Sequence, residues 1–406
     1  MKKSAFLLIL LLVTACSGNN KSKLFGEINS GTTIINLKDF DENKVFKYSD
    51  VYSDVEYVPL ECTEKSIVGS INKFEITNDN DYVIFDYSNG QIIRFDKKGK
   101  YLNNIGTRGH GTNEYVSPEI VVYNKYTNQV VVYDGAVKSL KHFSLDGKLQ
   151  EITKLSKYIY DFGVIDSANF VIFANHRDLL LNDEIAYNYE IINKNGDIVA
   201  QYEPYTKDRM NYRSGLTRSF FQQEDGLTFI ECFLPVIYKQ DKDYNVLPAY
   251  YMDFGDREIP QEWLECENVQ ETEMKIHSEN SNVAYCNFFY ESTNKYILSV
   301  IMSDSRIVDL IIDKNSKKII NGNIKNNDIY GIMTSVFEYY NNNKIYGIIS
   351  HEFAELKYSE LSDPIRSKFI EECYRKDGYT VTEKDKKLLY KCSSNNNPII
   401  QICTLK

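Results

Sequence analysis

The sequence lacks the short motifs that identify most catalytic and metal-binding proteins. No pair of its eight cysteines has the CxxC spacing of a zinc knuckle or a dithiol redox centre. HExxH and the carboxylate-rich calcium loop are absent, and so is the GxSxG nucleophile turn. These absences argue against the common zinc, calcium, redox and serine-hydrolase sites, and we expect no bound cofactor.

Basic residues are also in short supply. The chain of 406 residues has 47 lysines and arginines against 57 aspartates and glutamates, a net charge of −10. Nucleic-acid binding requires clustered positive charge to neutralise phosphates. We therefore expect no nucleic-acid partner.

The only long apolar run lies at the N-terminus, from Ala5 to Val13, after Lys2 and Lys3. It is too short to span a membrane as a mature helix and has the form of a signal peptide over residues 1–15. Thr14 and Ala15 before Cys16 resemble a bacterial lipobox, which predicts lipidation of Cys16. The alternative is an ordinary secretory signal with an incidental cysteine. We expect a protein held outside the cytoplasm by a lipid anchor, on the periplasmic or the surface side, with the outer membrane favoured.

A strand–turn–strand unit recurs along the chain. Its turns centre on Gly99, Gly147, Gly196, Asn245 and Ser316, spaced by 48, 49, 49 and 71 residues. Each unit is an apolar strand, a polar turn and a second strand. A period of roughly 40 to 50 residues with four strands per unit is typical of a β-propeller.

Alternating apolar residues and turn signals divide the chain into six blades, which predicts an all-β, six-bladed propeller of four-stranded antiparallel blades over residues 55–406. Residues 16–54 form a tether and N-terminal segment. The last blade lacks outer strands of its own. Joining VEYVPLE (55–61) to the C-terminal run PIIQICTL in one blade would close the ring and remove its open edges.

Two insertions account for the remaining length. One spans about residues 255–279 and contains the only tryptophan, Trp263, while the other spans about 352–397 inside the last blade. The second has helical signals, with Ser362 or Asp363 as a cap, Pro364 in the first turn, and Thr382 with Asp385 as a second cap. Its predicted apolar face consists of Ile365, Phe369, Ile370 and Cys373.

The lengths of the connections distinguish the two faces of the predicted ring. Turns from strand one to two and from three to four are short throughout, and we expect them to close one face. The other connections hold every long segment: 106–117, 176–184, 203–219, 255–279 and the insertion after His351. Binding sites commonly lie on variable loops over a rigid scaffold, so the long-loop face is the predicted contact surface.

With the repeats in place, the chain resembles the six-bladed β-propeller lipoproteins of Gram-negative gut bacteria, which are loosely similar to NHL-type propellers. The similarity rests on FDKKGKYLNNIGTRGHGTNEY (95–115), on VEYVPLE and on NPIIQICTLK at the end. It covers nearly the whole mature chain. The resemblance implies the fold and an envelope location and implies no particular activity.

The stretch GTRGHGTNEY (106–115) invites comparison with a phosphate loop, but it has neither GxGxxG spacing nor a Walker lysine. A crossover between blades, in which Arg108 and Glu114 pair or cap locally, explains it more simply. Arg108, Glu114 and Tyr115 nevertheless remain candidate ligand-binding residues near the axis.

Other polar residues on the long-loop face are further candidates. His110, His176, His277 and His351 fall there and could assemble a metal or acid–base site with Asp178, Asp183 or Glu352. Arginines from the same loops could receive a carboxylate or a sulfated or uronic sugar, or could form surface ion pairs. The candidates from this group are His176, Arg177, Arg213, Arg218 and His351.

The favoured function is a lipid-anchored, non-enzymatic binding protein of the cell envelope that contacts a glycan, peptide or protein through the long-loop face. The alternative is a propeller hydrolase or lyase with a metal in its central channel. A third role, structural and within an envelope complex, predicts an apolar patch around Trp263 and the helical insertion.

Overall fold

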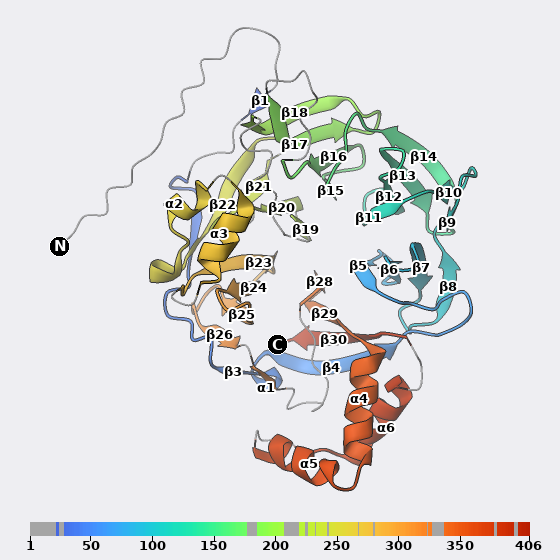
Figure 1. Cartoon of the computed structure of the whole chain (residues 1–406), viewed down its shortest axis with the longest axis vertical. Coiled ribbons are helices and arrows are strands. Elements are labelled where there is room, and N and C mark those ends of the chain that lie inside the picture. The colour runs from blue at the N-terminus through green and yellow to red at the C-terminus, as the bar shows by residue number, and fades with distance from the viewer. Residues whose placement is uncertain are drawn as a thin grey trace, which may run out of the picture.

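A computed structural model describes residues 22–23, 28–176, 185–206, 219–223, 226–231, 233–241, 243–266, 268–278, 281–322, 324–326, 337–376, 380–393 and 397–406. Within these residues, six antiparallel sheets surround a common axis (Figure 1). The predicted six-bladed propeller is confirmed. None of the helices in this part of the chain combines the length and apolar composition needed to cross a bilayer.

Blades 1 to 5 follow one another along the chain, and in each the first strand is the innermost. Three of these are blade 1, with β5 (Ile71–Ile76), β6 (Tyr82–Asp86), β7 (Gln91–Phe95) and β8 (Tyr101–Asn104); blade 2, with β11 (Pro118–Asn124), β12 (Gln129–Asp134), β13 (Ser139–Ser144) and β14 (Leu149–Lys154); and blade 3, with β15 (Asp161–Val164), β16 (Asn169–Phe173), β17 (Ala186–Asn193) and β18 (Ile198–Tyr205). The other two are blade 4, with β19 (Phe220–Gln223), β20 (Gly226–Ile230), β21 (Val236–Gln240) and β22 (Val246–Asp253), and blade 5, with β23 (Ala284–Glu291), β24 (Lys295–Met302), β25 (Ile307–Asp313) and β26 (Ile319–Gly322). A short pair, β9 (Thr107–Arg108) and β10 (Glu114–Tyr115), folds the crossover between blades 1 and 2.

Blade 6 combines the two ends of the chain, as predicted. It consists of β28 (Tyr339–Asn341), β29 (Lys344–Ile349), β30 (Ile399–Leu405) and, as its outer strand, β4 (Tyr52–Pro59). β30 and β4 are antiparallel, with Ile399 opposite Pro59 and Cys403 opposite Val55. The ring is therefore closed by backbone hydrogen bonds between segments that are far apart in the sequence.

The segment before β4 adds strands to the outside of the ring. β1 (Ser22–Lys23) pairs with β18, β2 (Thr33–Asn36) with β22, and β3 (Val45–Lys47) with β27 (Ile324–Asn326), all in parallel. Helix α1 (Tyr48–Val51) then leads into β4. Phe40 and Phe46 from this segment are buried. The N-terminal segment thus covers outer edges that would otherwise be open to pairing.

The repeated glycine of the sequence has a structural cause. Gly99, Gly147 and Gly196 each adopt a positive φ in the turn from strand three to strand four. Each also lies against a backbone carbonyl at the end of the preceding blade's outer strand, that of Pro59, Asn104 or Lys154. A side chain would collide with that carbonyl, so these positions require glycine for both conformation and space.

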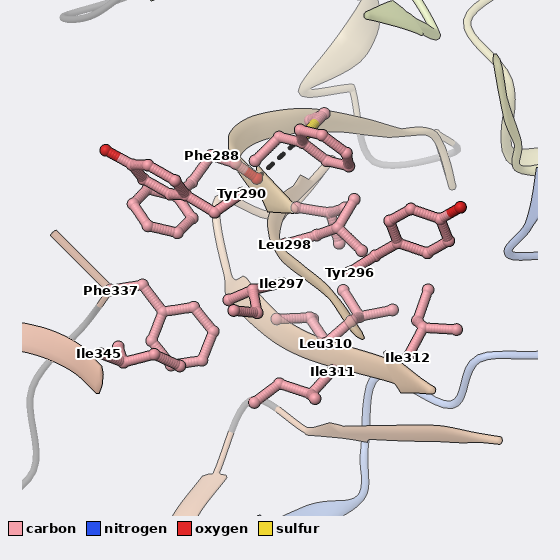
Figure 2. Packing of buried hydrophobic residues seen from close by; sticks show 14 of the residues in the cluster. Phe288, Tyr290, Tyr296, Ile297, Leu298, Leu310, Ile311, Ile312, Phe337 and Ile345 are labelled. Atoms are coloured by element: carbon pink, nitrogen blue, oxygen red, sulfur yellow. Dashed lines mark hydrogen bonds between the residues drawn. The ribbon is translucent and has the colours of Figure 1, made fainter. Parts of the chain in front are cut away.

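Apolar side chains fill the spaces between neighbouring blades rather than a single central core. Figure 2 shows part of the largest cluster, where Phe288 and Tyr290 of β23 and residues of β24 and β25 approach Phe337 and Ile345. Both faces of each sheet are covered by a neighbouring blade, so successive residues of one strand are buried on opposite sides. Val130, Val131 and Val132, for example, are all inaccessible to solvent.

Both insertions are helical. The first contains the 3₁₀ turn η2 (Gly255–Arg257), α2 (Gln261–Leu264) and α3 (Val269–Ile276). The second contains α4 (His351–Ser362), α5 (Arg366–Lys376) and α6 (Glu383–Ser393) and projects outward from blade 6 (Figure 1). The capping pair is confirmed, because the Thr382 N–H donates to Asp385 Oδ2 over 2.7 Å.

The predicted apolar face of the second insertion is correct for Ile370 and wrong for Ile365, Phe369 and Cys373. In α5, Ile370 and Tyr374 pack against α4, α6 and the blade, whereas Phe369 and Cys373 face solvent, as does Ile365 just before the helix. Helical spacing groups these residues on one side but does not decide which side packs against the rest of the protein. The packed face is instead the one that also places Glu371 within 3.0 Å of Lys386 on α6.

Candidate functional site

In the part of the chain that the structure describes, three cavities lie along the propeller axis, between the inner strands. Two, of about 470 and 660 Å³, are lined by residues from the first halves of inner strands, at the end where the long connections lie. The third, of about 290 Å³, is lined by the last residues of inner strands, at the short-turn end. The expectation that tight turns close the short-turn face is wrong, because these turns surround the 290 Å³ cavity and do not cover it.

Lys73 of β5 lines each of these three cavities, although only 9% of its surface is exposed. Its Nζ lies 3.8 Å from Asp161 Oδ1 of β15, which joins blade 1 to blade 3 past the inner strand of blade 2. Asp161 also accepts backbone hydrogen bonds from Phe162 and Ser219, each over 2.9 Å. The carboxylate is held by blades 3 and 4 and presents its charge to Lys73.

The 470 Å³ cavity combines aromatic and charged side chains. Tyr87, Arg108, Glu119 and Tyr160 line it together with the Lys73–Asp161 pair. Tyr87 is 61% exposed, and Arg108 is exposed and lies over Gly90, where a built Cβ would be 3.5 Å from Nη1. The cavity therefore has a buried ion pair at one side and exposed hydrogen-bonding and aromatic groups at its opening.

The 660 Å³ cavity adjoins the first, since Asn72 and Lys73 line both. Asn287, Ser299, Glu338 and Ser350 contribute polar groups, and Phe221, Phe288 and Phe337 contribute apolar surface. Ser350 caps α4 by accepting a hydrogen bond from the Phe353 N–H over 3.3 Å. The two cavities are therefore adjacent, and their combined lining includes residues from all six blades.

The short-turn cavity has a different lining, made of tyrosines and amides from the ends of inner strands. Lys125 crosses this end, and its Nζ donates to the backbone carbonyl of Gln223 over 2.9 Å, which joins blade 2 to blade 4. The Asn78 N–H donates to the Tyr123 hydroxyl over 3.0 Å, and burial raises the pKa of Tyr123. The main lining side chains of this kind are Asn78, Asn80, Tyr123, Gln222, Gln223, Tyr290, Tyr339, Tyr340, Asn341 and Asn342.

The three candidates of the blade 1–2 crossover have different environments. Arg108 lines the 470 Å³ cavity. The Glu114 carboxylate turns back into its own loop, where Oε2 accepts the Gly111 N–H over 2.5 Å, as expected for a local cap. Tyr115 as a ligand contact is wrong, because it is 1% exposed and packs edge-to-face on Phe143, and burial raises its pKa.

The histidine candidates lie apart from one another. The His176 ring packs against Tyr205 at 4.8 Å, and the backbone N–H of His176 donates to Asn188 Oδ1 over 3.0 Å. The His351 Nε2 lies 3.4 Å from Glu352 Oε1 at the start of α4. In the described parts of the chain, no three His, Cys, Asp or Glu side chains are placed to hold a metal ion together. Arg177, Arg213 and Arg218, like Cys16, lie outside the described residues.

Sequence reasoning missed the charged residues of the inner strands. Lys73 and Glu75 alternate with Phe74 and Ile76 along β5, and both charged residues are buried. This alternation was visible in the sequence. It puts Lys73 and Glu75 on one side of the strand and apolar residues on the other, which indicates a polar surface facing the axis. The partner of Lys73, Asp161, had no such signal because it lies 88 residues further along the chain.

Comparisons with known proteins agree with the fold. A family model described as "Domain of unknown function (DUF4934)" matches residues 32–404. A crystal structure of a protein from Bacteroides fragilis described as exported is 16% identical, with a TM-score of 0.68, and the match covers 92% of this chain and 100% of that one. A DUF4221 family member from Bacteroides vulgatus is 10% identical, with a TM-score of 0.50 and coverage of 88% and 97%. No functionally curated protein matches the sequence.

Proposed function

This chain belongs to the DUF4934 family, and from that membership and the cavities on its axis we propose that it is a non-enzymatic binding propeller that recognises a glycan at its long-loop end. The observation that carries the proposal is the 470 Å³ cavity, where exposed Tyr87 and Arg108 stand at the opening beside the buried pair Lys73–Asp161. Binding sites typically combine apolar or aromatic walls with a few fixed polar groups.

Each part of this lining suits a sugar. A tyrosine ring offers a flat apolar face with a polar tip, and Tyr87 and Tyr160 both line the cavity. Arg108 offers several N–H donors in a fixed plane for hydroxyl or carboxylate oxygens. Lys73 and Asp161 supply a donor and an acceptor whose positions are fixed by burial. Because the charges of this lining include both signs, a neutral or weakly acidic sugar fits better than a polyanion.

The proposal includes a location in the cell envelope. It is supported by the apolar run Ala5–Val13 followed by Cys16 and by the exported Bacteroides fragilis protein of the same fold. Lipidation of Cys16 would leave a tether of a few residues before Ser22, the first residue that pairs with the propeller. We propose that this tether holds the ring at the membrane while the long-loop end stays accessible.

A binding experiment with two matched pairs of variants tests the glycan proposal. The mature chain from residue 17 is screened against bacterial, plant and host oligosaccharides, and the affinity for the best ligand is measured by calorimetry. Tyr87→Ala and Arg108→Ala should each weaken binding roughly tenfold, the effect of losing about 1.4 kcal/mol of interaction. Tyr126→Ala and Arg306→Ala remove an exposed tyrosine and a partly exposed arginine that do not line this cavity and should leave the affinity unchanged.

Two results would overturn the proposal. One is a panel-wide absence of binding by a folded protein, and the other is glycan binding that Tyr87→Ala and Arg108→Ala leave intact. Turnover of a bound oligosaccharide, detected as new reducing ends, would move the assignment to the hydrolase or lyase alternative.

A further inference from the structure

The outer face of α5 exposes large apolar side chains that the fold does not use. Ile365 is 83% exposed and Phe369 is 71% exposed. Both belong to the helical projection formed by α4, α5 and α6. Leu356 on α4 and Tyr390 on α6 are also more than half exposed. Exposed apolar side chains gathered on one element commonly mark a contact surface.

The opposite face of α5 is already occupied. Ile370 and Tyr374 pack against the cluster formed by α4, α6 and blade 6, and Glu371 pairs with Lys386. The helix therefore cannot rotate to bury Ile365 and Phe369 without exposing Ile370 and Tyr374. The apolar residues of the outer face are held outward by the packing of the inner face.

Basic residues surround the exposed apolar pair. The exposed side chains of α5 include Arg366, Lys368, Arg375 and Lys376, against one exposed carboxylate, Glu372. Glu372 lies 3.8 Å from Lys376, and the other three basic side chains are also exposed. This local excess of positive charge contrasts with the net charge of −10 for the chain.

The position of α5 favours a lipid bilayer over a folded protein as the binding partner. α5 forms the far end of the helical projection (Figure 1), and Ile365 and Phe369 are exposed there. A folded partner would need a matching hollow, whereas a bilayer accepts a protruding phenylalanine and isoleucine directly. Apolar residues flanked by lysine and arginine are the pattern of helices that lie in the interface of anionic membranes.

We propose that the outer face of α5 docks onto an anionic lipid bilayer, with Ile365 and Phe369 entering the acyl region and Arg366 and Lys368 contacting headgroup phosphates. This contact is independent of the ligand at the long-loop end. It would act as a second attachment in addition to any acyl chain on Cys16. Two weak attachments hold a protein at a membrane far more firmly than one.

The test uses the mature chain from residue 17, which lacks the apolar leader and Cys16 and retains every described residue. A flotation experiment compares vesicles of pure phosphatidylcholine with vesicles that also contain about 40 per cent phosphatidylglycerol. This content gives the second set a strongly anionic surface. We expect binding to the anionic vesicles only. The double variant Ile365→Ser/Phe369→Ser should reduce the bound fraction roughly tenfold, since each removes a side chain whose burial drives insertion.

Two controls separate docking from a general loss of structure. Met274→Ser removes a 67% exposed apolar side chain from α3, in the other insertion, and should leave vesicle binding unchanged. Phe369→Trp adds a fluorophore to a chain with one native tryptophan, Trp263, and its emission should shift to shorter wavelength with anionic vesicles. The unfolding temperature of each variant should match that of the parent, because the replaced side chains are exposed.

Failure to bind anionic vesicles would overturn the proposal, as would binding that is insensitive to the double variant. Self-association of the parent chain in ultracentrifugation, lost in the double variant and without vesicle binding, would also overturn it and assign this face to a second copy.

Discussion

Gly147 in blade 2 lies directly against the backbone carbonyl of Asn104 in blade 1. A Cβ built on Gly147 would be 2.5 Å from the Asn104 oxygen, and the glycine has a φ of +84°. Gly99 and Gly196 have the same relation to the blades before them. The turn that repeats most clearly in the sequence is therefore also a contact between consecutive blades.

Replacing this glycine should be costly. Gly147→Ala forces either a collision with the Asn104 carbonyl or a shift of the turn, and we expect the free energy of unfolding to fall by about 2 to 4 kcal/mol in urea denaturation. Gly226→Ala is the matched control, because Gly226 also has a positive φ but no atom within 4 Å of its built Cβ. Equal losses for the two variants would show that conformation alone matters and that the contact between blades contributes nothing.

The salt bridges of Glu291 should make stability depend on pH. Burial opposes ionisation of this carboxyl, but hydrogen bonds from Lys239 (2.8 Å), Lys314 (2.6 Å) and Tyr250 outweigh it and lower its pKa to about 2. The folded state therefore binds the proton less readily than the unfolded chain, whose glutamate pKa is about 4.3. The stabilisation is present above about pH 4.3 and is lost as the pH falls toward 2.

Glu291→Gln should lower the free energy of unfolding at pH 7 by about 1 to 2 kcal/mol, a value reduced from the full shift because the pair is partly exposed. The difference between variant and parent should shrink as the pH approaches 2.5. The exposed Glu64→Gln serves as the reference. A difference that stays constant from pH 7 to pH 2.5 would contradict the assigned role of Glu291.

Lys125 should stabilise the short-turn end of the ring. Its Nζ donates to the Gln223 carbonyl across the opening of the 290 Å³ cavity, and a hydrogen bond from a charged donor contributes roughly 1.5 to 3 kcal/mol. We expect Lys125→Met to lower the free energy of unfolding by about 1 to 2 kcal/mol and to increase hydrogen exchange at β19. Lys100→Met, at an exposed position in blade 1, should do neither.

Acylation at Cys16 is a separate prediction. Mass spectrometry of the membrane fraction should show a mature N-terminus at residue 16 that carries lipid, and Cys16→Ser should abolish both the lipid and the cleavage. Cleavage that continues unchanged in Cys16→Ser would favour the ordinary secretory signal.

Local patterns in the sequence were enough to predict the blades. Strand alternation and turn glycines such as Gly99 and Gly147 depend on neighbouring residues, so the repeat predicted six blades and their approximate limits. The closure of β4 on β30 was also predictable, because a ring with an open edge would be unstable. The capping pair Thr382 and Asp385 could be read directly, since the two residues lie three positions apart.

The parallel strands of the N-terminal segment could not be read in this way. β2 is short and adds to the edge of blade 4, and β3 is short and pairs with β27, so both pairings depend on partners that are far away in the sequence. The apolar face predicted for α5 was only partly correct for a related reason. Helical periodicity shows which residues share a face, but only contacts with α4 and α6 decide which face turns inward.

The sequence by itself determined the architecture of this protein, because periodicity and turn chemistry act over a few residues. The tertiary structure alone decided where the candidate cavity on the axis lies and which residues line it. Lys73 and Asp161 come from blades 1 and 3, and the folded ring places Tyr87 and Arg108 in the lining of the same cavity. A cavity made by residues from separate blades depends on distances in space, and a single sequence does not contain those distances.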